Sequence, residues 1–238
     1  MLDNGVPQKI ESLLGETEPL DVLFTFDRSS SVQGERLRRL KDASYAVLDH
    51  LAPADRAGLV TFDDSFLLRT PLGADPTVIR SAVDSIEPGG ATALLDTVYA
   101  ALTLAESRTR RTFILLFTDG WDNLSWLSKR DVLNLARESE AVVYAVAHKS
   151  SDSSGPDEAL LRELTGATGG RVVFVDASDR LTKIFVAMLQ EMRSRYLMTY
   201  SPTGVDASGW HTLSVRLKHK SGRVVARHGY FQQAAELR

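Results

Sequence analysis

The stretch DVLFTFDRSSSV, residues 21–32, runs from an apolar segment directly into one carboxylate and three consecutive hydroxyls. Short apolar runs of this length are typical of strands that are buried on both faces of a sheet. Asp27, Ser29 and Ser31 follow the point where such a strand ends. In isolation this pattern is most often a strand that leads into a helix N-cap, so its meaning depends on what the rest of the chain places beside it.

Four more apolar runs follow along the chain, at residues 57–62, 112–118, 141–147 and 171–175. Amphipathic helices lie between and after these runs, as the apolar spacing of residues 37–51 and 181–192 indicates. Alternating strands and helices predict right-handed crossovers and a mostly parallel sheet with helices on both faces. Residues 66–70 follow too closely for a helical crossover, so we expect an antiparallel edge strand there. The predicted fold class is a doubly wound α/β domain with a six-stranded sheet.

The spacing changes after Arg195. Three apolar segments separated by short Gly-containing loops then predict an antiparallel β meander. We therefore divide the chain into an N-terminal segment (1–19), an α/β domain (20–195) and a C-terminal β extension (196–238). Residues 3–14 have a second possible place, paired with the C-terminal strands.

Composition excludes several classes of protein. The 238 residues are 43% hydrophobic and include no cysteine, which excludes disulfides, thiolate nucleophiles and Cys-ligated zinc. The longest apolar runs, such as residues 113–117, are far shorter than the ~20 residues of a membrane-spanning helix. The N-terminus has no basic start before an apolar stretch, so we expect no secretory signal in this chain. Residues 210–238 contain six Lys or Arg residues and one acidic residue, which we interpret as a solvated strand face and not as a nucleic-acid site.

Oxygen-bearing side chains follow two predicted strands and begin one predicted helix. Besides the residues after 21–26, Asp119 follows the strand at 112–118, and Thr92 lies at the start of the helix before that strand. Ligands of open parallel sheets bind at the carboxyl ends of the strands, so these loops are expected to meet at one edge. Two carboxylates and three hydroxyls are the kind of ligand set that Mg²⁺ prefers. The sequence therefore predicts a cation site formed by Asp27, Ser29, Ser31, Thr92 and Asp119.

The order D-x-S-x-S, then Thr92 after a glycine turn, then TDG resembles the von Willebrand factor A (VWA) domain and its metal-ion-dependent adhesion site (MIDAS). TDGWDNLS, LTGATGGRVVF, RYLMTYSP and ARHGYF are similar to blocks of a bacterial subfamily first noted in Acidobacteria. The start of the chain resembles the end of a β-domain that precedes the A domain in that subfamily. This chain would then begin partway through a longer module.

The resemblance implies a protein-binding module without a catalytic reaction. A bound Mg²⁺, Mn²⁺ or Ca²⁺ would coordinate an Asp or Glu carboxylate of a partner protein, and the location would be extracytoplasmic or secreted in bacteria. Three positions depart from the family pattern, because Ser30 and Ala91 replace glycines and Arg28 stands inside the first motif. Asp27→Ala is expected to abolish the site and leave the fold intact, on the premise that Asp27 is an exposed loop carboxylate.

Three residues after the second motif are candidates for a partner-binding rim: Trp121, Asp122 and Ser125. Capping of the helix near 128–138 is an equal alternative for Asp122 and Ser125, and packing under the loop is an equal alternative for Trp121 and Trp126. Two other functions stay open. One is a metal-assisted hydrolase or phosphatase with Asp27 as nucleophile and His148 or Asp122 as acid or base. The other is a structural VWA domain whose metal site has lapsed.

Overall fold

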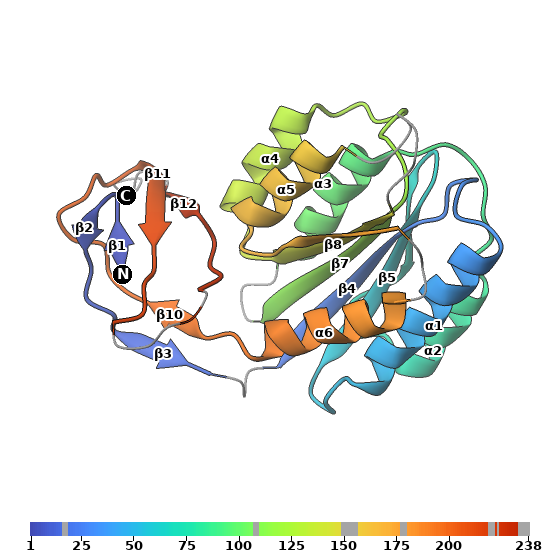
Figure 1. Ribbon diagram of the computed structural model, residues 1–238, viewed down its shortest axis with the longest axis horizontal. Helices are drawn as coiled ribbons and strands as arrows, with labels where there is room; N and C mark the ends of the chain where they lie inside the picture. Colours follow the sequence, from blue (N-terminus) through green and yellow to red (C-terminus); the bar gives the residue numbers. More distant parts are fainter. Residues whose placement is uncertain are drawn as a thin grey trace.

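Strand β4 (Leu20–Asp27), which contains the apolar run quoted above, lies in the middle of a six-stranded sheet, and all eight of its residues are buried. The computed structural model describes residues 1–15, 19–106, 110–148, 157–176, 180–218, 222 and 224–232. Figure 1 shows the main sheet between two layers of helices, with a smaller β unit beside it. The first and last described strands both lie in this unit.

The strand order of the main sheet is β6-β5-β4-β7-β8-β9. Its parallel strands besides β4 are β5 (Arg56–Phe62), β7 (Arg111–Thr118), β8 (Val142–His148) and β9 (Val172–Val175). The edge strand β6 (Phe66–Thr70) is antiparallel to β5, as predicted from the short connection. The predicted doubly wound α/β class is confirmed.

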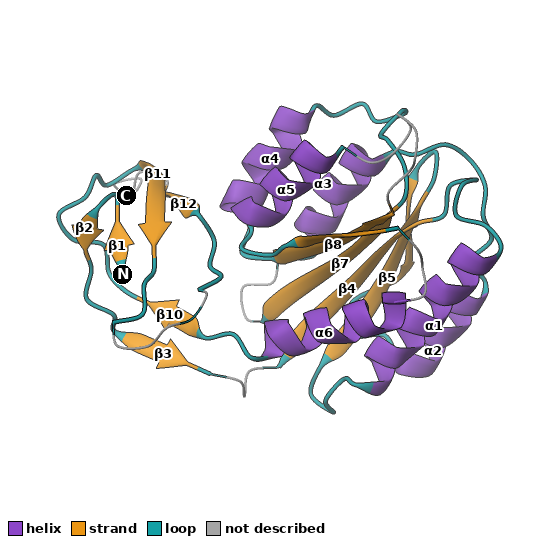
Figure 2. Cartoon of the chain, in the orientation of Figure 1, coloured by secondary structure: helices purple, strands orange, loops and turns teal. Residues whose placement is uncertain are grey.

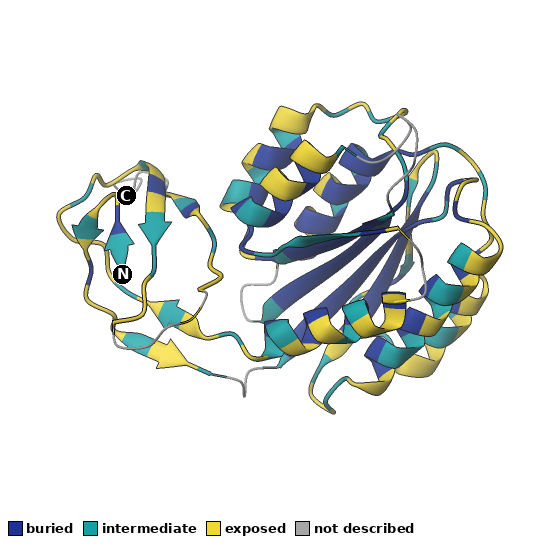
Figure 3. Ribbon diagram, in the orientation of Figure 1, coloured by how far each residue is buried: buried dark blue, intermediate teal, exposed yellow. Residues whose placement is uncertain are grey.

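Helices cover both faces of the sheet (Figure 2), and each face has its own apolar core. One face is covered by α1 (Glu35–Asp49), α2 (Pro76–Asp84) and α6 (Leu181–Arg193), and the other by α3 (Leu94–Leu104), α4 (Lys129–Glu138) and α5 (Glu158–Ala167). Alternate residues of β4 point to opposite faces of the sheet and belong to different cores. Phe24 and Phe26 pack toward α6, whereas Leu23 packs toward α3. Figure 3 shows the consequence, with buried strands between helices that are exposed on their outer sides.

The β unit is built from both ends of the chain. A four-stranded sheet has the order β12-β11-β1-β2, and a separate pair joins β10 to β3. Its strands are β1 (Leu2–Asp3), β2 (Val6–Pro7), β3 (Ser12–Leu14), β10 (Leu197–Thr199), β11 (Gly209–Ser214) and β12 (Gly229–Gln232). The C-terminal strands are antiparallel as predicted, but β10 pairs with the N-terminal β3 instead of with β11. The second placement considered for residues 3–14 is therefore the one observed.

A buried carboxylate fastens the two ends of this unit together. Asp3 of β1 accepts hydrogen bonds from the Tyr200 and Tyr230 hydroxyls at 2.8 and 3.0 Å, and its Oδ1 lies 2.9 Å from Nδ1 of His211. Since an unpaired buried carboxylate is costly, these three partners make the position of β1 specific.

The carboxyl ends of β4 and β7 lie side by side at the centre of the sheet, where Phe26 pairs with Phe117. From β4 the chain crosses to β5 on one side, whereas from β7 it crosses to β8 on the other. Such a reversal opens a crevice outside the strand ends, where ligands of doubly wound sheets bind.

Candidate metal centre

Asp27 is the last residue of β4, and its side chain is buried and does not line the pocket described below. Oδ1 accepts a hydrogen bond from the Ser29 amide at 2.9 Å, and Oδ2 accepts one from the Thr118 hydroxyl at 2.8 Å. Burial raises the pKa of Asp27 to about 6, and the hydrogen bonds from Ser29 and Thr118 offset only part of that rise. The premise that Asp27 is an exposed loop carboxylate is wrong, because β4 extends through this residue and its side chain is fully buried.

The hydroxyls after β4 turn toward the end of β7. Ser29 Oγ lies 3.1 Å from Ser31 Oγ, and the Ser31 hydroxyl donates to Oδ1 of Asp119 at 2.7 Å. Residues 88 positions apart in sequence are thus joined by one hydrogen bond. The first and third oxygen-rich loops meet as their places after β4 and β7 predict.

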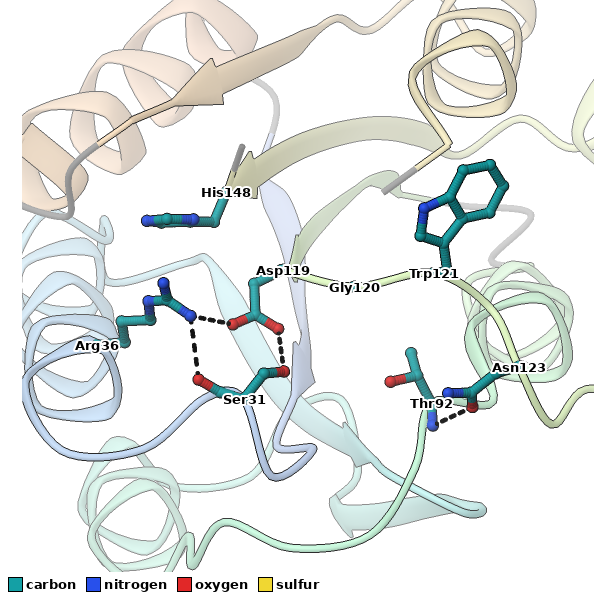
Figure 4. A pocket seen from close by; sticks show the side chains of 8 residues that line it. All are labelled: Ser31, Arg36, Thr92, Asp119, Gly120, Trp121, Asn123 and His148. Atoms are coloured by element: carbon teal, nitrogen blue, oxygen red, sulfur yellow. Dashed lines mark hydrogen bonds and ion pairs between the residues drawn. The ribbon is translucent and has the colours of Figure 1, made fainter. Parts of the chain in front are cut away.

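The loop that contains Thr92 completes a pocket of about 340 Å³, which Ser31, Thr92 and Asp119 all line. The Thr92 amide donates to Oδ1 of Asn123 at 2.9 Å, which holds this loop to the segment after β7. Figure 4 shows the Thr92 hydroxyl pointing toward the side of the pocket where Ser31 and Asp119 lie. No hydrogen bond of that hydroxyl is found within the described part of the chain. Three loops therefore bring hydroxyl and carboxylate oxygens to one cavity.

Arg36 also lines the pocket, and the sequence analysis missed it. Its Nη1 lies 3.0 Å from Oδ2 of Asp119 and 3.2 Å from the carbonyl oxygen of Ser31 (Figure 4). The side chain comes from the first turn of α1, whose N-terminus faces the crevice. A cationic side chain in the first turn after a D-x-S-x-S loop is the sequence signal that would have drawn attention to it. In this structure the carboxylate of Asp119 is paired with a guanidinium.

The departures from the family pattern are accommodated. Arg28 forms an ion pair with Asp63 and donates to the carbonyl of Glu87 at 2.9 Å, so its charge points away from Asp27. Ser30 does not need the conformation that favours glycine, because Asn4 is the only non-glycine with positive φ among the described residues. Its hydroxyl donates to the carbonyl of Gly90 at 3.1 Å.

Gly90, the glycine before Ala91, is the one whose conformation is required in this loop. Its φ is +79°, and a Cβ atom there would lie 2.8 Å from Oδ1 of Asp64. The same Asp64 oxygen accepts a hydrogen bond from the amide of Ala91. The turn that presents Thr92 is thus held by the β5–β6 hairpin, which supplies Asp64.

Asp122 and Ser125 hold the loop that follows β7 to α3. The Asp122 carboxylate accepts from the Leu95 amide at 2.7 Å, and the Ser125 hydroxyl accepts from the Asp96 amide at 3.1 Å. These contacts cap α3, not α4, which has its own capping box formed by Ser128 and Asp131. Asp122 and Ser125 do cap a helix, but the capped helix is α3 and not the expected helix near 128–138.

The two tryptophans near the pocket are exposed. Trp121 lines the cavity with 42% of its surface accessible, and Trp126 is 96% exposed. The alternative in which both pack under the loop is wrong.

The residues present fit a hard cation in their chemistry. Hydroxyl and carboxylate oxygens are the preferred ligands of Mg²⁺. A positive ion near Asp27 would favour the charged carboxylate and so offset the effect of burial, which raises its pKa. The described residues hold no cluster of three or more His, Asp or Glu side chains suited to a metal, so a metal at this pocket would also need hydroxyl ligands. Arg36 would compete with such an ion for Asp119.

The geometry gives little support to Asp27 as a nucleophile. Its side chain is fully buried, and both of its oxygens accept hydrogen bonds from within the chain. Asp122, one of the two groups considered as acid or base, uses its carboxylate to cap α3. His148, the other, lies at the end of β8 and lines the pocket.

Comparison with known proteins gives consistent matches. The chain is 25% identical over 143 residues to human inter-alpha-trypsin inhibitor heavy chain H4, a match that covers 55% of this chain and 15% of the heavy chain. The pig protein of the same name is 28% identical over 113 residues, which cover 43% of this chain and 12% of that protein. This chain therefore spans only a small part of the length of these relatives.

Solved structures share the fold. A von Willebrand factor type A protein from Catenulispora acidiphila superposes with a TM-score of 0.65 at 16% identity, covering 74% of this chain and 43% of that one. Proximal thread matrix protein 1 from the mussel byssus, with a zinc-occupied MIDAS motif, gives 0.66 at 21% identity, covering 79% and 49%. The vWF domain of the pilus tip protein Mfa5 from Porphyromonas gingivalis gives 0.56 at 13% identity, covering 74% and 95%.

The narrower resemblance to the bacterial subfamily stays a prediction. The family model of the von Willebrand factor type A domain matches residues 21–187, which span β4 to α6 and include all five candidate ligands. The chain belongs to the von Willebrand factor type A domain family.

Proposed function

We propose that this chain is a metal-dependent protein-binding module. The proposed ligands of a divalent cation, Mg²⁺ with Mn²⁺ or Ca²⁺ as alternatives, are Asp27, Ser29, Ser31, Thr92 and Asp119. The observation that carries the proposal is the convergence of Ser31, Thr92 and Asp119, from three loops, on one pocket at the topological switch point. VWA domains mediate protein interactions, and the zinc-occupied MIDAS motif of the mussel neighbour supports a divalent ion in this fold.

Each residue would contribute differently to binding the ion. The hydroxyls of Ser29, Ser31 and Thr92 are neutral ligands, whereas the carboxylates of Asp27 and Asp119 supply the charge that balances a divalent cation. A bound cation would supply an open coordination position for an Asp or Glu carboxylate of a partner protein. The remaining positions would be taken by water, as is usual for Mg²⁺ in proteins.

We also propose an extracytoplasmic location and the division of the chain at residues 19 and 195. Two structural neighbours belong to a pilus tip and to a mussel byssus, which supports a place outside the cytoplasm. In the part of the chain that the structure describes, no helix is long and apolar enough to cross a membrane.

Calorimetric titration with Mg²⁺ and Mn²⁺ tests the metal site. The wild type should bind one ion, and Thr92→Val and Ser31→Ala should each weaken binding at least tenfold, because each removes one hydroxyl oxygen from the ligand set. Ser30→Ala is the matched control, since the Ser30 hydroxyl bonds to the carbonyl of Gly90 and is not a proposed ligand. A wild type that binds neither ion would overturn the metal-dependent function.

The ion pair of Arg36 with Asp119 favours one second candidate, a structural VWA domain whose metal site is closed by this arginine. The same titration separates the two, because a closed site binds no ion at millimolar concentration. A pull-down with and without chelator then tests the partner, which the first proposal expects to be lost with chelator.

A further inference from the structure

The loop that follows Asp119 exposes three large apolar side chains, of which Trp121 lines the pocket. Trp121, Leu124 and Trp126 are 42%, 45% and 96% accessible, and Trp126 is the most exposed large hydrophobic residue of the described chain. Exposed large apolar side chains on one loop are typical of protein-binding surfaces, and tryptophan is enriched at their energetic centres. We call these three side chains the apolar rim.

The backbone below the apolar rim is held in place on α3. The carboxylate of Asp96 accepts hydrogen bonds from the amides of Trp126 at 3.0 Å and of Leu127 at 2.9 Å. Asp122 and Ser125 hold the same loop to the first turn of α3, as described above. The backbone that carries the exposed Trp126 side chain is therefore held in place. A surface that is already ordered loses little conformational entropy when a partner binds.

The two cationic side chains near the apolar rim are each paired with a carboxylate. Arg36 lines the adjoining pocket and pairs with Asp119, and Lys129, whose Nζ lies 6.0 Å from the centre of the Trp121 ring, pairs with Asp157. The proposed metal would therefore supply the positive charge that attracts an acidic ligand. A complementary ligand has to combine an acidic group for the pocket with apolar surface for the rim.

We propose that the apolar rim is the second half of the partner site, and that the partner is a protein segment with a Leu or aromatic residue within about three positions of its acidic residue. At ~3.3 Å per extended residue, such a spacing places the apolar side chain within about 10 Å of the carboxylate. The acidic half of this proposal rests on the proposed function. The apolar half rests on the exposed residues alone.

A displayed library of random 12-residue peptides, selected on the immobilised chain in Mg²⁺, tests both halves. Enrichment of an acidic residue with a nearby Leu or aromatic residue is the expected result. Acidic enrichment without an apolar preference overturns the apolar rim and leaves the proposed function standing. Apolar enrichment without an acid contradicts the proposed function, and a pool with neither preference overturns this inference.

The selected peptide is then titrated against variants. Trp126→Ala should weaken peptide binding at least tenfold and leave Mg²⁺ affinity within twofold, because Trp126 contacts its fold through the backbone amide, which alanine keeps. Leu104→Ala, an exposed apolar residue at the opposite end of α3, is the control and should change neither affinity. Unchanged peptide affinity in Trp126→Ala overturns the inference.

Discussion

Replacement of Arg36 by methionine should tighten metal binding. In the structure the guanidinium bonds the buried carboxylate of Asp119 at 3.0 Å and the carbonyl of Ser31 at 3.2 Å, and a cation at the proposed site would have to displace it from Asp119. Methionine keeps most of the apolar stem of arginine and removes the charge. The variant therefore isolates the competition between the guanidinium and the metal for Asp119.

The magnitude follows from the geometry of this ion pair. A hydrogen bond to a charged group contributes about 1.5–3 kcal/mol net, and 40% exposure of the Arg36 side chain reduces this to about 1–2 kcal/mol through solvent screening. Since about 1.4 kcal/mol corresponds to tenfold in affinity, Mg²⁺ should bind Arg36→Met about 5- to 30-fold more tightly than the wild type.

Titration calorimetry at pH 7.5 measures this change, with Arg38→Met as the matched control. Arg38 carries the same charge two residues away but pairs with Glu35 in solvent, so its loss should change Mg²⁺ affinity less than twofold. The metal-free Arg36→Met protein should also be less stable to urea than the wild type, because Asp119 loses its cation. Mg²⁺ affinity that is unchanged or weaker in Arg36→Met would refute the competition.

Three further predictions concern stability. Asp27→Asn should raise the free energy of unfolding of the metal-free protein at pH 7.5 by up to about 3 kcal/mol and leave it unchanged at pH 3. The native pKa of about 6 lies above the ordinary 3.8, so protonated Asp27 stabilises the native wild type at low pH, and this stabilisation is lost as the pH rises through 6. Equal urea unfolding curves of wild type and variant at pH 7.5 would contradict this prediction. Gly90→Ala should cost at least about 1–2 kcal/mol in urea unfolding, since φ is positive and Asp64 is in contact, whereas Gly89→Ala, with open space around it, should cost less. Mg²⁺ at 100 times its dissociation constant should stabilise the fold by about 2.7 kcal/mol, seen as a higher unfolding temperature that EDTA reverses, and no change would argue against a metal bound to the native state.

Most of the sheet could be predicted because its signals are local. Strands buried on both faces need nearly continuous apolar sequence, so residues 21–26 and 112–118 predict β4 and β7 within a residue or two of each end. The antiparallel β6 follows from a connection too short for a helix. The pairing of β3 with β10 is different, since strands so far apart in sequence meet only through the packing of whole elements.

The meeting of three predicted ligands at one pocket could be expected from the sequence, but their contacts with charged groups could not. Ser31, Thr92 and Asp119 line one pocket because the carboxyl ends of neighbouring parallel strands share an edge. The burial of Asp27 was misjudged, because the last residue of a central strand lies below the loops that follow it. The contact of Arg36 with Asp119 joins residues 83 positions apart and could not be seen in either motif.

The amino-acid sequence by itself determined the alternation of strand and helix, the two-sided core and the order of the five oxygen-bearing residues, because periodicity and spacing are properties of neighbouring residues. Only the tertiary structure decided which charges meet. It buried Asp27, turned Arg28 away to Asp63 and brought Arg36 onto Asp119. The physical reason is that electrostatic energy depends on distances between groups in space, and those distances exist only after β4, β7 and α1 have packed together.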